Sequence, residues 1–212
     1  MWGKWIGCTV PEAARGRFAE AQRGWSAIGG RPGLVGQVGG WDGATGRAHV
    51  LALWADEEAY GRFMREQHDA VFAATGQGGS YTAIEVATGP TVLTMAGDAG
   101  DNLPLALRRA TLLRVADCHL LPGRDDHFLQ VQRDRWAPGM AAAGGMLAGA
   151  VTRLAPHRHL VTTLWTSPTA HARYAADHLP GLLARAELDA DLHGITGHVL
   201  PLEPTWRVSA DT

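Results

Sequence analysis

The sequence predicts an α+β protein that consists of two tandem βαββαβ repeats. Its 212 residues suit two small domains of about 100 residues each. Both halves show strand-like alternation and helical periodicity in the same order. Three residues recur 111 positions further along the chain: Trp25 as Trp136, Trp54 as Trp165 and Arg62 as Arg173. Because tryptophan is rare, two tryptophan pairs at one separation indicate an internal duplication, with the halves related like the subunits of a homodimer.

Six elements are expected in the first half. Pro11 suits the first turn of a helix, Asp42-Gly43 suits a hairpin turn, and Asp56 suits a helix N-cap. Between these signals, alternation with a period of two marks strands, and spacings of three and four mark helices. The expected elements are strand 2–9, helix 11–28, strands 34–41 and 47–54, helix 57–75, and a strand over 80–87 or slightly beyond.

The second half repeats this order. Ser167-Pro168 has the pattern of a serine N-cap followed by proline at the first helical position. The βαββαβ order is that of the ferredoxin-like fold. The expected elements are strand 110–118, helix 123–138, strands 145–153 and 158–165, helix 168–187 and strand 192–200. We therefore expect a first ferredoxin-like repeat at 1–96, a flexible connector at 97–108 and a second, diverged repeat at 109–212.

Composition disfavours several classes of protein. Apolar residues make up 46% and charged residues 19% of the chain, as in ordinary globular proteins. A formal net charge of −2 gives no basic surface for nucleic acid, and no run of about 18 apolar residues marks a membrane span. The N-terminus lacks the pattern of a secretory signal. We expect a cytoplasmic protein without nucleic-acid or membrane partners, in which Cys8 and Cys118 are buried free thiols.

Several motifs in the first half together resemble a known family. They are Gln22-Arg-Gly-Trp25, Pro32-Gly-Leu-Val-Gly-Gln-Val-Gly-Gly-Trp41, Leu53-Trp54-Ala-Asp-Glu-Glu-Ala-Tyr60-Gly-Arg-Phe63-Met64 and Gln67-His68-Asp69-Ala-Val-Phe72. Over roughly residues 1–90 the chain resembles the small YdbC-like proteins of bacteria. Those proteins belong to the dimeric α/β-barrel superfamily, together with the antibiotic-biosynthesis monooxygenases. The second half keeps only the outline, since Leu179 stands where the first half has His68.

The resemblance implies that the two repeats pack sheet to sheet as a fused dimeric α/β barrel, with the helices outside. Ligands in this superfamily lie between a sheet and its own helices. The superfamily's activities include cofactor-free oxygenation of aromatic polyketides, haem degradation and chlorite decomposition. Its haem-degrading members place an iron-binding histidine on the second helix, where this chain has His68. The implied ligand is a small apolar or aromatic molecule, and the implied cofactor is either none or haem.

Five aromatic residues are candidates for the walls of a ligand pocket. The tryptophans among them either fill the helix–sheet core or provide flat surfaces on which a planar ligand stacks. Eight tryptophans in 212 residues are more than such a core needs, which favours a pocket. The candidates are Trp25, Trp54 and Phe63 in the first half and Trp165 and Tyr174 in the second half.

Four polar residues are candidates for chemistry. His68 lies beside the apolar stripe of the expected helix 57–75. It is either a partly buried structural histidine or a general base or haem ligand, and His178 is its candidate counterpart. Arg62 and Arg173 either pair with a carboxylate or bind an anionic ligand group. No spacing of Cys, His and carboxylates matches a strong metal signature, so we expect no metal site.

The leading functional hypothesis is a monooxygenase-like enzyme that acts on an aromatic or polyketide-like substrate in specialised metabolism. In a cofactor-free reaction, His68 or His178 takes a proton from a phenol or enol, and Arg62 stabilises the anion. The alternatives are a haem-binding or haem-dependent enzyme with a helix histidine on the iron, and a non-catalytic ligand-binding or stress-associated module. We expect the first pocket to be the functional one, in a monomeric fused dimer or a further homodimer.

Overall fold

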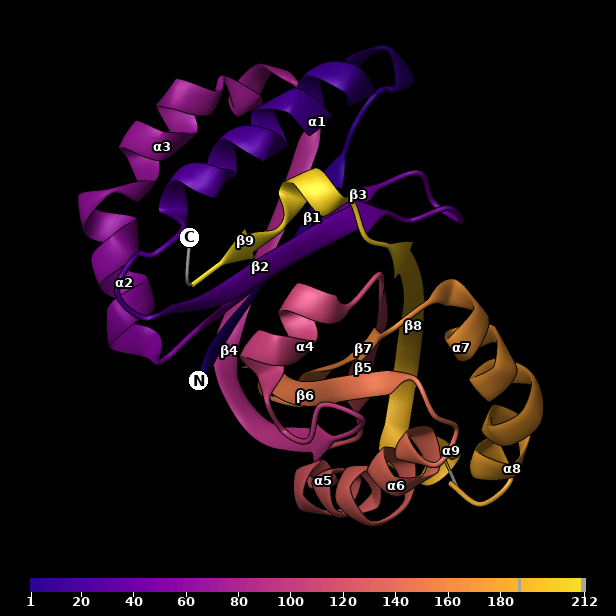
Figure 1. Ribbon diagram of the computed structural model, residues 1–212. Coiled ribbons are helices and arrows are strands. Elements are labelled where there is room, and N and C mark those ends of the chain that lie inside the picture. The colour runs from indigo at the N-terminus through magenta and orange to yellow at the C-terminus, as the bar shows by residue number, and fades with distance from the viewer. Residues whose placement is uncertain (187, 211–212) are drawn as a thin grey trace. The chain divides into compact units, whose positions relative to one another are not determined.

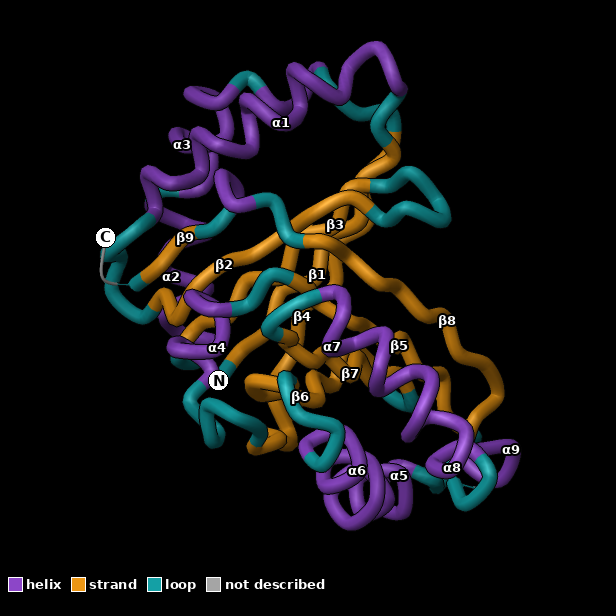
Figure 2. The backbone as a smooth tube through the Cα atoms, turned by 45° about the vertical axis from the view of Figure 1, so that its right-hand side comes forward, coloured by secondary structure: helices purple, strands orange, loops and turns teal. Residues whose placement is uncertain are grey.

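The computed structural model describes residues 1–186 and 188–210, which form two compact units. Unit 1 comprises residues 1–90 and the described C-terminal residues from Leu200 onward, and unit 2 comprises Thr91–Val199. Each unit is α+β, with an antiparallel sheet and helices packed against it, drawn in orange and purple in Figure 2. Among the described residues, no helix is both long enough and apolar enough to cross a membrane.

Unit 1 has the βαββαβ order expected of a ferredoxin-like repeat (Figure 1). Its elements are β1 (Trp2–Thr9), η1 (Glu12–Ala14), α1 (Arg15–Arg23), η2 (Gly24–Ile28), β2 (Leu34–Trp41), β3 (Ala48–Trp54), α2 (Glu57–Glu66), α3 (His68–Thr75), η3 (Gln77–Gly79) and the first part of β4 (Ala83–Ala96). The C-terminal residues add η6 (Pro204–Trp206) and β9 (Val208–Ser209). The strands lie in the order β4-β1-β3-β2-β9, and β1 runs antiparallel to both β3 and β4.

Unit 2 repeats this arrangement with the strand order β8-β5-β7-β6-β4. Its elements are α4 (Leu103–Arg109), β5 (Leu112–Leu120), α5 (Asp125–Val131), η4 (Gln132–Trp136), α6 (Ala137–Ala141), β6 (Met146–Ala155), β7 (Arg158–Trp165), α7 (Pro168–Arg173), η5 (Tyr174–His178), α8 (Leu179–Leu183), α9 (Leu188–Asp191) and β8 (Leu192–Pro201). In both units the central strand ends at the duplicated tryptophan. Trp54 pairs with Trp2, and Trp165 pairs with Leu112.

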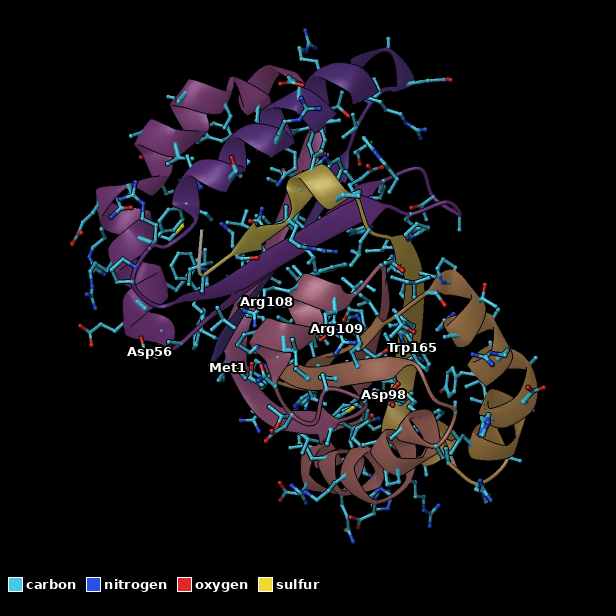
Figure 3. All side chains as sticks on the ribbon, in the orientation of Figure 1. Met1, Asp56, Asp98, Arg108, Arg109 and Trp165 are labelled. Carbon is cyan, nitrogen blue, oxygen red and sulfur yellow. The ribbon has the colours of Figure 1, made fainter. Side chains whose placement is uncertain are left out.

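The N-caps predicted for the second helix of each unit are present. The Asp56 carboxylate accepts a hydrogen bond from the Ala59 amide at 2.7 Å, and the Ser167 hydroxyl accepts one from the Ala170 amide at 3.0 Å. Asp56 lies at the start of α2 in Figure 3. The helix expected over 57–75 is divided, however, because the backbone at Gln67 (φ −137°) leaves the helical region and α3 begins at the next residue.

Both long helices of unit 2 contain a wide π-helical turn that the sequence pattern did not indicate. The turns are η4 and η5, and each is followed two residues later by a proline, Pro138 and Pro180. Proline has no N–H to donate to the preceding turn, which loosens the regular i to i−4 hydrogen bonding there. The expected helices 123–138 and 168–187 are therefore observed as α5-η4-α6 and α7-η5-α8.

The repeat boundaries differ from those expected at 96 and 109. Residues 91–96 of β4 pair with β6 inside unit 2, so β4 is longer than the strand expected over 80–87. The connector 97–108 contains all of α4 except Arg109, and this helix is capped by Asn102 and buries Leu103. The second repeat was expected to extend to 212, but the chain returns to unit 1 at Leu200.

Burial of Trp206 accounts for the return to unit 1. Its side chain is fully buried, and its ring lies 5.6 Å from that of Phe18 and 5.3 Å from that of Trp41. A buried indole of this size contributes roughly 3–5 kcal/mol. The adjoining β9 extends the sheet of unit 1 by pairing with β2.

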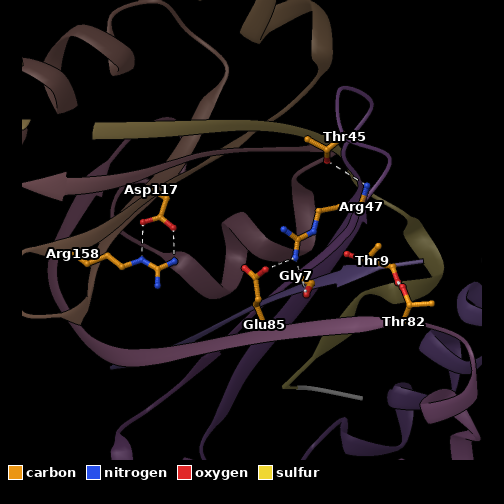
Figure 4. Close-up of polar contacts among 8 residues, drawn as sticks. All are labelled: Gly7, Thr9, Thr45, Arg47, Thr82, Glu85, Asp117 and Arg158. Carbon is orange, nitrogen blue, oxygen red and sulfur yellow. Dashed lines mark hydrogen bonds and ion pairs between the residues drawn. The ribbon is translucent and has the colours of Figure 1, made fainter. Parts of the chain in front are cut away.

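Polar contacts tie neighbouring strands within each unit (Figure 4). In unit 2, Arg158 donates two hydrogen bonds, of 3.0 and 2.6 Å, to the Asp117 carboxylate. In unit 1, Arg47 donates to the Gly7 carbonyl at 3.4 Å and to the Glu85 carboxylate at 3.1 Å. The Arg158–Asp117 pair is bidentate, which makes it a stronger interaction than the single contact between Arg47 and Glu85.

Candidate functional site

Unit 1 contains a cavity of about 380 Å³ between its sheet and its helices. Small-molecule pockets typically measure about 300–1,000 Å³, so the cavity suits a small ligand. Most of its lining side chains are apolar or aromatic, and among the described residues that line it there is no Asp or Glu. Ile84 and Val86 of β4 line the cavity and are also half exposed, so they mark its mouth.

Aromatic rings form one wall of the cavity. Trp54 ends β3, and its buried ring stacks on Phe63 of α2 with a centroid distance of 4.9 Å and an interplanar angle of 25°. Tyr60, one turn earlier on α2, lies 6.1 Å from Trp54. Trp25 of η2 is a further lining ring. Planar ligands gain stacking energy on such surfaces beyond the burial of apolar area.

His68 occupies a corner of the cavity, because the break at Gln67 makes it the first residue of α3. Its ring lies 5.6 Å from Trp25 and stacks on Phe72 at 6.0 Å with an interplanar angle of 7°. The Asp69 carboxylate lies 2.9 Å from Nδ1 of His68. A carboxylate at that distance accepts the Nδ1 proton, which leaves Nε2 of the neutral ring as a proton acceptor.

A buried chain of three polar side chains fixes Trp25. The indole Nε1–H donates to Oε1 of Gln77 at 2.7 Å, and Nε2 of Gln77 donates to Oε1 of Gln22 at 2.7 Å. All three side chains are buried and line the cavity. Gln77 lies in η3, so this loop connects the wall of the cavity to α1.

Lys4 is the only lysine or arginine among the described residues that line the cavity. It lies on β1 with its side chain only 8% exposed, and burial lowers its pKa from 10.5 to about 8. Its ammonium lies 3.9 Å from the Met64 sulfur and 5.6 Å from the centre of the Tyr60 ring. Both are weak partners for a buried charge.

The residues around this cavity are those that sequence comparison matches. Residues 3–88 match the family described as "Domain of unknown function (DUF4937)". The "Uncharacterized protein YdbC" of Bacillus subtilis (strain 168) is 33% identical to this chain over 82 residues, which are 37% of this chain and 69% of that protein. The chain belongs to the YdbC family. The predicted resemblance is therefore confirmed, and the matched range contains the cavity-lining residues from Lys4 to Val86.

Two solved structures have the same fold as this YdbC-family chain. One is a "putative monooxygenase" from Lactobacillus acidophilus NCFM, with a TM-score of 0.72 and 14% identity, covering 99% of this chain and 96% of that one. The other is an "anthrone oxidase-like protein", with a TM-score of 0.70 and 14% identity, covering 95% and 91% of the two chains. They confirm the predicted α+β class and show that this chain shares the fold of those two proteins.

The equivalent interior of unit 2 in this YdbC-family chain holds a cluster of buried apolar and aromatic residues. Trp165, which Figure 3 labels, is fully buried beside Tyr174 at a ring distance of 5.1 Å. Trp136, Met140 and Met146 belong to the same cluster. The Tyr174 hydroxyl is buried and has no hydrogen-bond partner among the described residues, and burial raises its pKa. Tyr174 stands where unit 1 has Phe63, but its ring is packed into the core.

The other predicted polar residues lie outside the cavity of unit 1. Arg62 is exposed on α2 and pairs with Glu58 at 3.4 Å. Arg173 is exposed at the end of α7, and His178 is half-buried at the end of η5 in unit 2. Of the catalytic candidates, His68 alone lines the cavity.

Sequence reasoning did not single out Lys4 or Gln77 as site residues. A signal for Lys4 was present, since it alternates with Trp2, Ile6 and Cys8 on one face of β1, and an isolated lysine on an apolar strand face is unusual. No local pattern marks Gln77, which stands in a glycine-rich loop and reaches Trp25 only in the folded chain.

Replacing Gln77 by leucine should destabilise the protein by about 2–3 kcal/mol. The change leaves the Trp25 indole N–H and the Gln22 side-chain oxygen buried without partners. The free energy of unfolding in urea measures the loss. Gln130→Leu, at an exposed position of α5, is the control and should change stability by no more than about 0.5 kcal/mol. Equal effects of the two changes would contradict a structural role for the hydrogen-bonded chain.

Proposed function

We propose that this protein is a monooxygenase-like enzyme that binds a small aromatic or polyketide-like molecule in the cavity of unit 1. The cavity itself carries the proposal. Aromatic rings from β3, η2 and α2 wall a space of about 380 Å³, into which few polar groups point. Apolar pockets with a small number of convergent polar groups are typical of small-molecule sites. The shared fold of the anthrone oxidase-like structure agrees with this assignment.

The polar groups support chemistry that begins with deprotonation. Nε2 of His68 takes a proton from an acidic phenol or enol of the substrate, and Asp69 holds the ring in the required tautomer. The resulting anion transfers one electron to dioxygen, and the substrate radical and superoxide combine to a peroxide. The peroxide anion forms on a carbon that still carries a hydrogen, and it takes the proton back from His68. Loss of water then leaves a carbonyl group, so one oxygen atom enters the substrate and the other leaves as water. The largely apolar lining of the cavity limits the access of water to the reactive anion.

Haem is the alternative, and the lining residues fit it poorly. His68 offers an axial nitrogen, because Asp69 holds Nδ1 and leaves Nε2 available. Haem also carries two propionates, which need cationic partners or open water. The described residues that line the cavity include one Lys and no Arg, and that lysine is buried. The described lining therefore provides no exposed cationic partner for the propionates.

Ligand titration combined with oxygen uptake tests the proposal. Mono-, bi- and tricyclic phenols should quench tryptophan fluorescence saturably, at one ligand per chain, because Trp25 and Trp54 line the cavity. At least one should also be consumed together with dioxygen. If phenols bind but none of them is consumed together with dioxygen, the proposed oxygenase activity is contradicted. The protein would then be a ligand-binding module. A parallel titration with haemin that gives a saturating Soret shift, lost in His68→Ala, would favour haem instead.

A charge at the cavity mouth should weaken ligand binding without changing stability. Ile84 is 46% exposed and lines the cavity, so Ile84→Asp places a carboxylate where an apolar ligand enters and should raise Kd about tenfold. Ile195 of β8 is the matched control, because it is the equivalent residue of unit 2 and is 51% exposed. Ile195→Asp should leave Kd unchanged in the same fluorescence titration. Equal effects of the two substitutions would place the ligand elsewhere.

A further inference from the structure

Lys4 has an unusual position for a lysine. It is the single lysine of the chain. On β1 it pairs with Ala52 of β3 and Thr88 of β4, so it lies on an inner strand of the sheet of unit 1. Its side chain lines the cavity and is more than nine-tenths buried. Lysine is almost never buried to this degree unless its charge is paired.

The described surroundings of Lys4 supply no negative charge. The described residues that line the cavity include no carboxylate, and the contacts of the ammonium are the Met64 sulfur at 3.9 Å and the face of the Tyr60 ring at 5.6 Å. A thioether is a weak acceptor, and an aromatic face compensates only part of the desolvation of an ammonium. The fold therefore holds a cation beside an apolar cavity at a cost in stability, and an anion that enters the cavity would relieve that cost.

We propose that the Lys4 ammonium is the anion-binding group of the cavity and that it pairs with the ionised oxygen of a phenol or enol in the ligand. The inference rests on the proposed function and names its substrate class, aromatic molecules with an acidic hydroxyl group. The proton of that hydroxyl leaves to Nε2 of His68 or to water, and no other bond changes. Pairing with an ammonium in a medium of low dielectric favours the ionised form of the ligand.

The other titratable groups of the cavity are distinguishable from Lys4. They are Cys8 on the same strand, Tyr60 on α2, His68 on α3 and Tyr81 before β4. Burial raises the pKa of Cys8 to about 11 and raises the pKa of both tyrosines, so these three stay neutral around pH 8. The variant His68→Gln identifies any contribution from the imidazole.

A chromogenic phenol tests the inference directly. 4-Nitrophenol is the probe, because its phenolate absorbs visible light, and 4-nitroanisole is the control ligand of matched shape that cannot ionise. In the intact 212-residue chain, the pKa of bound 4-nitrophenol should fall by about 1–3 units relative to the free phenol. In Lys4→Met this shift should disappear and Kd for the phenolate should rise at least about tenfold, whereas Lys4→Arg, which restores a cation, should retain the shift. Binding of 4-nitroanisole should not weaken in Lys4→Met.

The outcomes separate the two proposals. Binding of both ligands, with the same pKa of bound 4-nitrophenol in wild type and Lys4→Met, would overturn the role of Lys4 and leave the aromatic cavity in place. Failure of both ligands to bind would overturn the proposed function and this inference with it. A covalent adduct of an aromatic aldehyde that borohydride fixes on Lys4, without a shift for the phenol, would show a nucleophilic amine and overturn the anion-binding role.

Discussion

Replacing Lys4 by methionine is expected to raise the free energy of unfolding at pH 7 by about 3 kcal/mol. Burial lowers the pKa of Lys4 from 10.5 to about 8 in the folded protein, and each unit of difference corresponds to about 1.4 kcal/mol. Methionine fills a similar volume and carries no charge to desolvate. Most substitutions of buried residues destabilise, so a gain of this size is the mark of a side chain that is kept for a purpose other than stability.

The stability gained by Lys4→Met should decrease as the pH rises. Below pH 8, Lys4 is protonated in both the folded and the unfolded protein, and the full cost of burying the charge is present. Between pH 8 and 10.5 the unfolded chain binds the proton more strongly, so the stability of the wild type rises with pH. Urea unfolding of wild type and Lys4→Met at pH 7 and near pH 10 should show the difference shrinking. A less stable Lys4→Met at pH 7 would mean that the ammonium has a strong partner, and would contradict the anion-site inference.

Most of the strands could be predicted from the sequence because their signals are local. Strands 2–9, 34–41 and 158–165 have the expected bounds, since apolar alternation and turn residues specify them without reference to the rest of the chain. The duplicated Trp54 and Trp165 indicated the repeat for the same reason, and the structure places both at the end of equivalent strands.

The features that could not be predicted from the sequence depend on contacts between residues that are distant in the chain. Nothing near Trp206 in the sequence indicates that it packs on Phe18, so the return of the C-terminal residues to unit 1 could not be expected. The hydrogen bond from Trp25 to Gln77 joins residues in separate elements. His68 was the stronger candidate in the sequence, but the sequence did not exclude Arg62. In the folded chain Arg62 is exposed on α2 and pairs with Glu58.

The duplicated tryptophans Trp54 and Trp165 allow a direct comparison of the two units. Trp165→Ala is expected to lower the free energy of unfolding more than Trp54→Ala does, but to leave ligand binding unchanged. Trp165 is fully buried in a hydrophobic cluster, and its indole N–H donates to the Thr163 hydroxyl at 2.9 Å. Removing such a ring costs about 3–5 kcal/mol. Trp54 is equally hidden from water, but one side of its environment is the cavity, where a ring has fewer atoms to contact.

Ligand affinity should respond in the opposite way. Trp54→Ala removes the ring that stacks on Phe63 and enlarges the cavity, so Kd for an aromatic phenol should rise at least about tenfold. Trp165→Ala should bind with the wild-type Kd at temperatures where urea unfolding shows it to be folded. If Trp165→Ala lost the ligand while folded, unit 2 would hold the working pocket. Opposite responses of stability and affinity at two equivalent positions would instead show that the duplication left one repeat with the pocket and the other with a filled core, because two copies in one chain are free to diverge.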